Sequence, residues 1–287
     1  MNQTLMSTPD AGHFFFCIGS QKTGTTLLAQ LIDRHPDMCC TVESYPFAYE
    51  SDVGMMNPDS ERGDKHGYSR ELREELFDTW HHSPLNVIRR VVRRLTGLNW
   101  TYPGTFRRTM SRAFQDFADR NDARVVGDKW PFYIPHIKLL RRAFPEASLI
   151  YTVRDPRGLW NSAEMFKERS RGDEILGEML RNDEFLFRHV PRESVLTVRF
   201  EDMVADTAET TRRICDHLGA EWDSGFLEYD PTADPYPRRW DWIPRSMSSI
   251  DPSVATKWRD RLEPAKVREI EARAATFMDR YGYVPEG

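Results

Sequence analysis

Residues 17–26, CIGSQKTGTT, have the outline of a phosphate-binding loop, but the lysine is displaced. In a nucleoside-triphosphate loop two glycines enclose four residues, and Lys and then Ser or Thr follow, so that the lysine reaches the terminal phosphates and the hydroxyl ligates magnesium. Gly19 and Gly24 have this spacing, but Thr25 takes the lysine position and the lysine is Lys22. The residues therefore indicate phosphate binding and leave open which phosphate ester suits such a loop.

Phosphate binding at this loop does not depend on a lysine in the usual position. The N–H groups of a glycine loop and of the first helical turn are unpaired donors at the positive end of a helix dipole, so they hold any compact dianion. The hydroxyls of Thr23, Thr25 and Thr26 add further donors. Lys22 precedes the helix, where its charge approaches an atom that bridges the bound phosphate and a transferable group. We therefore predict that Lys22 stabilises a leaving group.

A second phosphate site is indicated further along the chain, in the stretch YTVRDPRGLWNSAEMF (151–166). Arg154 ends a predicted strand, Pro156 breaks it, and Ser162 follows on the helix that begins there. An arginine at a strand end and a serine on the adjoining helix can converge on one phosphate. The alternative is that Arg154 forms an ordinary ion pair with Asp155 or with a helix acid, and that Ser162 is solvated.

These motifs together resemble those of the sulfotransferases that use 3′-phosphoadenosine 5′-phosphosulfate (PAPS). GSQKTGTT (19–26) is similar to the family's 5′-phosphosulfate loop, and RDPRGLWNS (154–162) is similar to its 3′-phosphate site. Residues 198–219 and 253–262 are also similar to family segments, the second to the loop that closes over the nucleotide. The resemblance covers most of the chain except 50–122, and it implies PAPS as co-substrate. The implied loop residues are Gly19, Gln21, Lys22, Thr23, Gly24, Thr25 and Thr26.

The resemblance also answers which phosphate ester suits the loop. PAPS carries sulfate on its 5′-phosphate and has no β- or γ-phosphate, so a lysine in the usual position would have nothing to hold. There is likewise no triphosphate-bound magnesium to ligate, and no metal site is expected. By resemblance, Lys22 stabilises charge at the oxygen between sulfur and the departing 5′-phosphate.

The acceptor hydroxyl or amine needs a base within hydrogen-bond reach. Glu43, just after the second predicted strand, is where several branches of the family carry a catalytic glutamate, although a capping or surface carboxylate is the alternative. Other branches use a histidine shortly after a third-strand lysine. Here Lys129 is followed by no histidine until His136, which favours Glu43, with Asp128 in reserve. Lys129 itself either contacts the sulfuryl group or forms a salt bridge near Asp128.

Aromatic and basic residues elsewhere are candidates for holding the nucleotide. Trp130 is placed to stack on adenine, and Trp258 with Lys257 and Arg259 is placed to clamp the nucleotide from the closing loop. For both tryptophans the alternative is packing in the hydrophobic core. For Lys257 and Arg259 the alternative is an ordinary solvated position.

A parallel α/β sheet is predicted to position these residues. Apolar, β-favouring runs alternate with segments of helical periodicity, an alternation typical of a parallel sheet with helices on both faces and ligands at the carboxyl ends of its strands. The predicted strands are 13–20, 38–42, 123–129, 148–155 and 194–200. The predicted helices include 134–144, 157–169, 173–188, 207–218 and about 264–281. We expect one three-layer domain over 1–287, and an ordered loop at 230–253.

Residues 50–122 are too long for a plain crossover, so we expect a mostly helical insertion there that covers the site. Within it, residues 79–115 contain seven arginines and no acidic residue. A basic amphipathic helix of this kind can recruit an anionic acceptor, a phosphorylated carrier or a membrane surface. The alternative is that the arginines pair with acidic residues just upstream. Those residues are Glu71, Glu74, Glu75 and Asp78.

Composition limits the class of protein. The chain has 287 residues with 40 basic and 45 acidic side chains, a formal net charge of −5, which argues against a general nucleic-acid binder. Its four cysteines match neither a disulfide framework nor a zinc site. The N-terminus has no signal-peptide pattern, and no stretch reaches the length of a membrane span. We therefore expect a protein of the reducing cytoplasm.

The predicted function is transfer of the sulfuryl group of PAPS to an acceptor, which releases 3′,5′-adenosine bisphosphate. A small molecule, a glycan or a lipid is expected as acceptor, through its hydroxyl or, second, its amine. Two alternatives remain. A small-molecule kinase would need magnesium and a lysine near the β- and γ-phosphates, and a non-catalytic module would bind adenosine bisphosphate without transfer. The sequence does not predict the oligomeric state.

Overall fold

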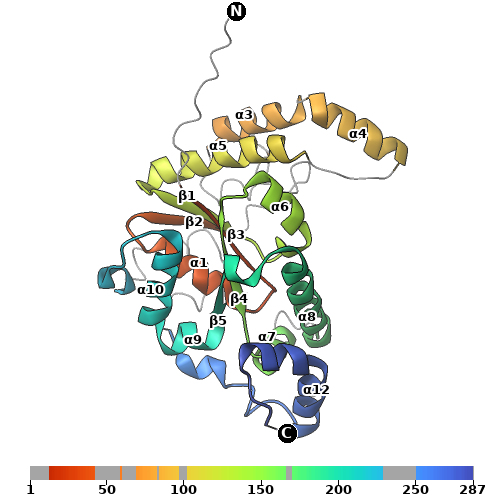
Figure 1. The fold of residues 1–287 in the computed structure, drawn as a ribbon, viewed down its shortest axis with the longest axis vertical. Helices are drawn as coiled ribbons and strands as arrows, with labels where there is room; N and C mark the ends of the chain where they lie inside the picture. Colours follow the sequence, from red (N-terminus) through yellow and green to blue (C-terminus); the bar gives the residue numbers. More distant parts are fainter. Residues whose placement is uncertain are drawn as a thin grey trace, which may run out of the picture.

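A five-stranded parallel sheet forms the centre of the protein (Figure 1). The computed structural model describes residues 13–42, 59, 69–82, 84–96, 102–165, 170–228 and 250–286. The strands are β1 (His13–Gly19), β2 (Met38–Val42), β3 (Val125–Lys129), β4 (Ser148–Val153) and β5 (Val195–Arg199). Their order across the sheet is β2-β3-β1-β4-β5, and all four pairings are parallel. The predicted α/β class with a parallel sheet is confirmed.

The strands are apolar on both faces because helices cover both sides of the sheet. Along β1, Phe14, Phe16 and Ile18 enter one core, and Phe15 and Cys17 enter the other. The first core is closed by α5 (Pro103–Asn121), α6 (Ile137–Ala143), α7 (Pro156–Glu164), α8 (Gly172–His189) and α12 (Pro264–Tyr281). The second is closed by α1 (Thr25–Asp33), α9 (Phe200–Ala205) and α10 (Thr207–Leu218).

After the neighbouring strands β1 and β4 the chain turns to opposite faces of the sheet, and this defines where a ligand can enter. The chain passes from β1 into α1 on one side and from β4 into α7 and α8 on the other. The two strands are neighbours, and their last residues stay in register, with Gly19 beside Thr152. A crevice at the carboxyl ends of such strands is the usual binding position in open parallel sheets.

Most predicted elements agree with the structure, and the differences have local causes. Helix 134–144 is split into η1 (Ile134–His136), which contains Pro135 in its first turn, and α6. α7 ends at Glu164, earlier than predicted. Most of the loop predicted at 230–253 lies outside the described residues.

Three helices lie between β2 and β3, namely α3 (Arg70–His81), α4 (Pro84–Thr96) and α5. α5 is the crossover helix to β3, since Phe106, Met110, Phe114 and Phe117 are buried in the larger core. α3 packs on α5 and adds two leucines to that core. No described side chain of α4 is buried. That 50–122 form an insertion covering the site stays a prediction.

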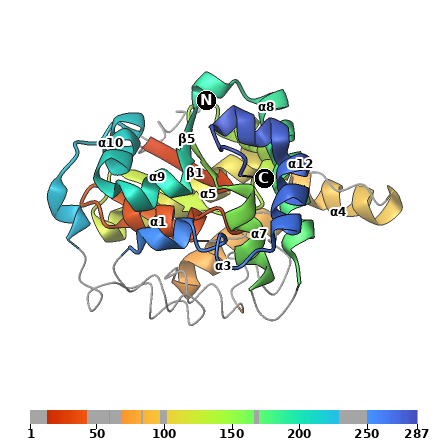
Figure 2. The same cartoon turned by 90° about the horizontal axis from the view of Figure 1, so that it is seen from below.

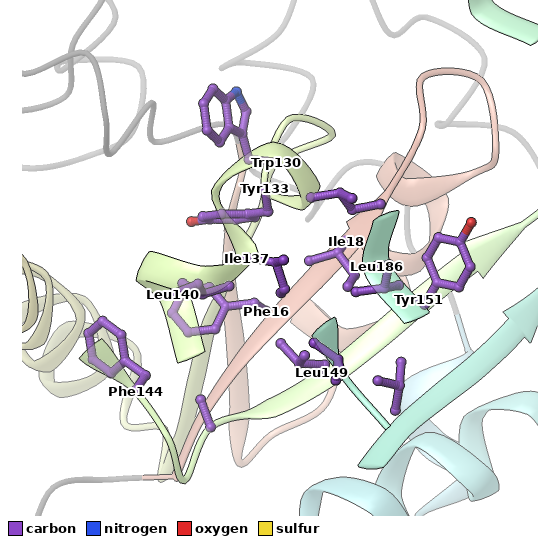
Figure 3. Close-up of a cluster of buried hydrophobic side chains, with 14 of the residues drawn as sticks. Phe16, Ile18, Trp130, Tyr133, Ile137, Leu140, Phe144, Leu149, Tyr151 and Leu186 are labelled. Atoms are coloured by element: carbon purple, nitrogen blue, oxygen red, sulfur yellow. The ribbon is translucent and has the colours of Figure 1, made fainter. Parts of the chain in front are cut away.

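Part of the larger core extends to the carboxyl edge of the sheet as a series of aromatic rings in edge-to-face contact. Figure 3 shows Tyr133 between Trp130 and Phe16. The ring centroid of Tyr133 lies 5.4 Å from that of Trp130 and 5.2 Å from that of Phe16. Trp130 is thus a buried member of a packed aromatic cluster, in agreement with the core-packing alternative.

Gly127, in the middle of β3, is required by the close approach of β1. A Cβ atom at this position would lie 2.6 Å from the ring of Phe15 and closer still to the carbonyl oxygen of Phe15. We expect Gly127→Ala to lower the free energy of unfolding by about 2 kcal/mol or more, since backbone must move to relieve the overlap. Urea denaturation of the purified variant measures the change.

Gly177, on α8, provides a matched control for this prediction. A Cβ there would meet only the far end of the flexible Arg181 side chain, at 3.1 Å. Because alanine favours helix over glycine, Gly177→Ala should raise stability by up to about 1 kcal/mol. Equal destabilisation by the two substitutions would contradict the steric argument for Gly127.

Three histidines make stability depend on pH. Burial lowers the pKa of His13, His136 and His217 below the ordinary value. The unfolded chain therefore binds more protons than the folded one, and stability present above about pH 6.5 is lost as pH falls toward the lowered pKa values. As pH falls, we expect the unfolding free energy to decrease by at most about 1.4 kcal/mol per pH unit for each extra proton that the unfolded chain binds.

The control for this prediction separates the histidines from the buried carboxyls. Burial raises the pKa of Glu201, which acts in the opposite direction as pH falls. Urea denaturation of wild type and His217→Gln at about pH 7.5 and about pH 5.5 isolates the histidine contribution. The variant should lose less stability than wild type between these two values, and an identical loss would contradict the assignment.

Candidate functional site

The loop between β1 and α1 owes its glycines to close packing. A Cβ at Gly19 would lie 2.9 Å from Thr23 Oγ1 and closer still to Thr152 Oγ1. Gly24 has φ 93°, and a Cβ there would lie 2.5 Å from the Phe200 ring. The glycine spacing thus lets the loop fold tightly against β4 and α9.

Thr23 holds the loop in shape from within. Its hydroxyl donates to the carbonyl oxygen of Ser20 at 2.7 Å and lies 2.8 Å from Thr152 Oγ1. Thr25 is buried in the first turn of α1, and Thr26 in the same turn is half-buried. The hydroxyl proton of Thr23 is therefore used by the loop itself, while a phosphate contact of Thr25 or Thr26 stays a prediction.

The first turn of α1 has the properties of an anion site. Its N-cap, Gly24, supplies no side-chain hydrogen bond, and the turn carries no acidic residue. The N–H groups at a helix start lack partners within the helix and lie at the positive end of its dipole. An anion bound at the loop would complete these hydrogen bonds.

Lys22 has a left-handed backbone, with φ 67°. Such a value is uncommon for a residue other than glycine and persists where the surroundings hold it. One contact of this kind comes from Arg154, whose Nη1 donates a hydrogen bond to the carbonyl oxygen of Lys22 at 3.0 Å. The two predicted phosphate sites are thus in direct contact.

Arg154 follows β4 directly and is only 9% exposed. Its Nη2 donates to the carbonyl oxygen of Val254 at 3.3 Å, and its guanidinium lies 4.1 Å from the ring centroid of Phe200. Burial lowers its pKa from the ordinary arginine value. The buried Nε has no hydrogen-bond partner. Arg154 is therefore a desolvated cation whose hydrogen bonds to Lys22 and Val254 use two of its five N–H donors, which leaves donors for an anion.

The ion pair expected as the alternative for Arg154 belongs to another arginine. Asp155 accepts from Arg157 at 2.7 Å and also caps α7. The other side of the Arg157 guanidinium pairs with Glu271 at 2.6 Å. Within the described ranges Arg154 itself pairs with no carboxylate. Arg157 is thus a structural arginine of α7, whereas Arg154 is available to a ligand.

Ser162 lies two turns along α7 from the strand end. It is half-buried, and its hydroxyl makes no hydrogen bond to any residue in the described ranges. Gly158 lies between it and Arg154, and a Cβ there would lie 3.3 Å from Arg154 Nε. Trp258 and the carbonyl oxygen of Ala255 would lie 3.5 and 3.7 Å from the same Cβ, so a small residue here lets the closing segment pack against α7 beside Arg154.

The closing segment packs on α7 through its tryptophan. Trp258 is 3% exposed and stacks on the Arg157 guanidinium, 4.1 Å from the ring centroid. Lys257 pairs with Asp251 at 2.9 Å, and Arg259 donates to Glu286, its Nε at 2.9 Å. Trp258 thus agrees with its packing alternative, and nucleotide contacts of the two basic residues stay predictions.

The predicted acceptor side lies at the ends of β2 and β3. Lys129 is 1% exposed and in register with Cys17 on one side and Val42 on the other. Asp128 accepts hydrogen bonds from Thr41 Oγ1 at 2.5 Å and from the Tyr133 hydroxyl at 2.6 Å. Both of its oxygens are therefore engaged, which makes it a poor reserve base.

Glu43 lies outside the described residues, so its role stays a prediction. His136, the histidine set aside for its distance in sequence, stacks on Trp130 with ring centroids 6.0 Å apart and planes 10° apart. Burial lowers its pKa, which keeps the imidazole neutral at pH 7. The turn through Pro135 brings it back onto Trp130, the residue after Lys129, which sequence distance alone did not indicate.

The comparison with known proteins decides the family. A sequence profile of the sulfotransferase family matches residues 15–224, which include both phosphate motifs. The chain belongs to this family.

Solved sulfotransferases share the fold. The sulfotransferase domain of the olefin synthase from Synechococcus PCC 7002 is 21% identical, with a TM-score of 0.60 over 93% of this chain and 98% of that one. The sulfotransferase domain of the curacin biosynthetic pathway is 16% identical, with a TM-score of 0.58 over 93% and 99%. Sulfotransferase STF9 from Mycobacterium avium is 15% identical, with a TM-score of 0.50 over 98% and 79%.

A carboxylate on α8 near the loop was missed by sequence reasoning. Asn182 Nδ2 lies 3.3 Å from Ser20 Oγ and 3.5 Å from Glu178 Oε1. Burial raises the pKa of Glu178, and Asn182 connects its carboxyl group to Ser20 of the loop. The residues are four apart on one helix, and only the packing of α8 on β1 relates them to the loop.

Proposed function

We propose that the protein transfers the sulfuryl group of PAPS to an acceptor hydroxyl or amine. The observation that carries this proposal is the contact between the two anion sites. The Arg154 guanidinium is bonded to the Lys22 carbonyl at 3.0 Å and retains an unpaired, buried Nε. Two phosphates joined by one ribose, as in PAPS, suit two anion sites side by side, whereas a triphosphate extends away along one chain.

Each site has its own role in this proposal. The first turn of α1 holds the 5′-phosphosulfate through backbone N–H groups, and Arg154 with Ser162 holds the 3′-phosphate. Trp258, Lys257 and Arg259 belong to the segment that closes beside Arg154, since Val254 of that segment accepts from it. Residues of the loop thereby fix the donor relative to Lys22.

Transfer breaks the bond between sulfur and the bridging oxygen and forms a bond from sulfur to the acceptor atom. The ammonium of Lys22 stabilises the negative charge that grows on the bridging oxygen, where a fixed charge in a shielded site contributes most. Lys129, at the end of the neighbouring β3, is proposed to contact the sulfuryl oxygens. A base removes the acceptor proton as the new bond forms.

Glu43 is the proposed base. We expect Glu43→Gln to lower kcat by about 100-fold near neutral pH and to remove the rise of rate with pH that titration of the base produces. Glu178→Gln is the matched variant, because it removes the other carboxyl group near the loop. An unchanged pH–rate profile in Glu43→Gln would exclude Glu43 as the base. If the rise of rate with pH disappears in Glu178→Gln, the base lies on α8.

Calorimetric titration tests the donor. The protein is titrated with 3′,5′-adenosine bisphosphate in the presence of a chelator and, separately, with ATP and magnesium. Metal-independent binding of the bisphosphate supports PAPS, and magnesium-dependent ATP binding without bisphosphate binding would favour the kinase. Tight bisphosphate binding with no sulfuryl transfer to any acceptor in a screen would favour the non-catalytic module.

The acceptor stays at the level of chemical class. A carbohydrate, a lipid or another small molecule with a hydroxyl group is proposed. No helix in the described ranges is long and apolar enough to span a membrane. All four cysteines are buried free thiols, and the expected cytoplasmic location is part of this proposal.

A further inference from the structure

Helix α4 leaves an apolar face bare. It projects from the body of the protein beside α3 and α5, as both views show (Figures 1 and 2). The exposed fractions are 43% for Val87, 52% for Ile88, 53% for Val91 and 77% for Leu95. These four make up half of the large hydrophobic residues that are exposed in the described ranges. Clusters of this kind mark interaction sites.

The rest of the helix is basic. Successive residues of an α-helix are about 100° apart, so the apolar residues and the arginines of α4 divide between two halves of its circumference. The apolar half contains Leu85, Val87, Ile88, Val91, Val92 and Leu95. The other half contains Arg89, Arg90, Arg93 and Arg94. The helix has no acidic residue, and neither does any position from 79 to 115.

The acidic residues upstream are engaged elsewhere. Three carboxylates of α3 pair within that helix or with α5. The pairs are Glu74 with Arg70 at 2.9 Å, Asp78 with His82 at 3.5 Å and Glu75 with Arg112 at 3.5 Å. Three of the four upstream carboxylates thus have partners outside α4, which weakens the alternative in which they neutralise its arginines.

We propose that α4 docks on an anionic lipid surface. A helix with a bare aliphatic face, arginines on the opposite half and few other polar residues is the type that lies in a membrane interface, with its apolar face among the acyl chains and its basic groups at the phosphates. By helical spacing, positions 89 and 94 border the apolar half on either side, and arginines at such positions suit contacts with lipid phosphates. The proposal is independent of the proposed sulfuryl transfer.

Charge argues for lipid over a second copy of the chain. Two α4 helices packed apolar face to apolar face would bury the aliphatic residues but leave the basic half of each helix, which carries no carboxylate, without a charge partner. The whole chain carries a formal net charge of −5, so attraction to an anionic surface must come from this local basic helix. Docking would therefore be salt-sensitive and would fix which side of the protein faces the membrane.

Vesicle co-sedimentation of the full chain tests the proposal. Vesicles of phosphatidylcholine alone are compared with vesicles that also contain phosphatidylglycerol, at low and at physiological salt. We expect binding to the anionic vesicles only, weakened by salt. Val91→Ser with Leu95→Ser should lower affinity by about tenfold or more through lost apolar burial. Arg89→Ser with Arg94→Ser should lower it by about fivefold for each arginine.

The controls use equally exposed residues away from α4. Val284→Ser removes an aliphatic side chain that is 74% exposed, and Arg188→Ser removes an exposed arginine of α8. Both should bind vesicles like wild type, and all variants should keep the wild-type melting temperature because they alter exposed side chains. Absence of vesicle binding by wild type, or equal binding by the Leu95 and Val284 variants, would overturn the proposal.

Two further outcomes would assign the apolar face of α4 to a partner other than lipid. Light scattering that shows a dimer in wild type and a monomer in Val91→Ser with Leu95→Ser would assign the face to a second copy. Failure to bind anionic vesicles at low salt, in a monomeric protein, would leave an acidic protein surface as the occupant. Either result contradicts lipid docking and leaves the sulfuryl-transfer proposal untouched, because none of these readouts depends on activity.

Discussion

Arg154→Ala is expected to weaken binding of 3′,5′-adenosine bisphosphate by more than about 30-fold. Truncating one partner of a buried, hydrogen-bonded charge pair costs at least about 2 kcal/mol, and Arg154 is 9% exposed with a buried Nε left for the phosphate. Isothermal titration calorimetry of wild type and variant in the same buffer measures the change. Ser162→Ala should cost less, about 1 kcal/mol, because it removes one neutral hydroxyl donor.

The control must separate ligand binding from loop shape, because Arg154 also bonds the carbonyl oxygens of Lys22 and Val254. Arg154→Lys keeps the charge and loses the planar guanidinium, so it should recover part of the affinity without restoring bidentate contact. Arg188→Ala removes an exposed arginine of α8 and should leave affinity unchanged. Wild-type affinity in Arg154→Ala would exclude this residue from the nucleotide site.

Lys22→Gly is expected to lower kcat by about 100-fold to 1,000-fold while bisphosphate binding changes little. The proposed ammonium acts on charge that appears only in the transition state, and donors of that kind contribute about this much. Glycine also suits the left-handed backbone of residue 22, with φ 67°, so the loop should keep its shape. Single-turnover transfer from PAPS, together with calorimetry of the bisphosphate, separates the two effects.

Lys22→Ala is the matched variant. It removes the same amine but places a Cβ on a left-handed residue, so it should be about as inactive and less stable than Lys22→Gly by about 1 kcal/mol. Equal activity loss with different melting temperatures would show that the amine acts in chemistry and the backbone in stability. A Lys22→Gly protein with normal kcat would contradict the leaving-group role.

The local parts of the site followed from the sequence because they depend on neighbouring residues. A strand, two glycines that enclose four residues and a helix lie within 13–33, and the structure confirms each element and gives the steric reason for both glycines. The strand end at Arg154 and the helix that begins at Pro156 were likewise predicted from proline and strand composition. Parallel pairing followed from the alternation of strands and helices.

Some features depended on packing, and the sequence left these open. Asp128 was considered as a base, but Thr41 on β2 and Tyr133 after β3 engage both of its oxygens. The alternative of an Arg154–Asp155 pair was natural for adjacent residues, yet a guanidinium two positions further, at Arg157, takes that carboxylate. Neighbours in sequence project in different directions at a helix start, and only the structure shows which arginine turns toward Asp155.

The sequence by itself determined the phosphate loop, the order of strands and helices, and the family to which the chain belongs, because these rest on local propensity and on short motifs. The tertiary structure decided how the two predicted anion sites meet and what α4 leaves exposed. Arg154 contacts the carbonyl of Lys22 across 132 positions of sequence, and Arg157 reaches Glu271 across 114. Such contacts exist only because parallel strands end at one edge of the sheet and α12 packs back onto α7, which no local pattern specifies.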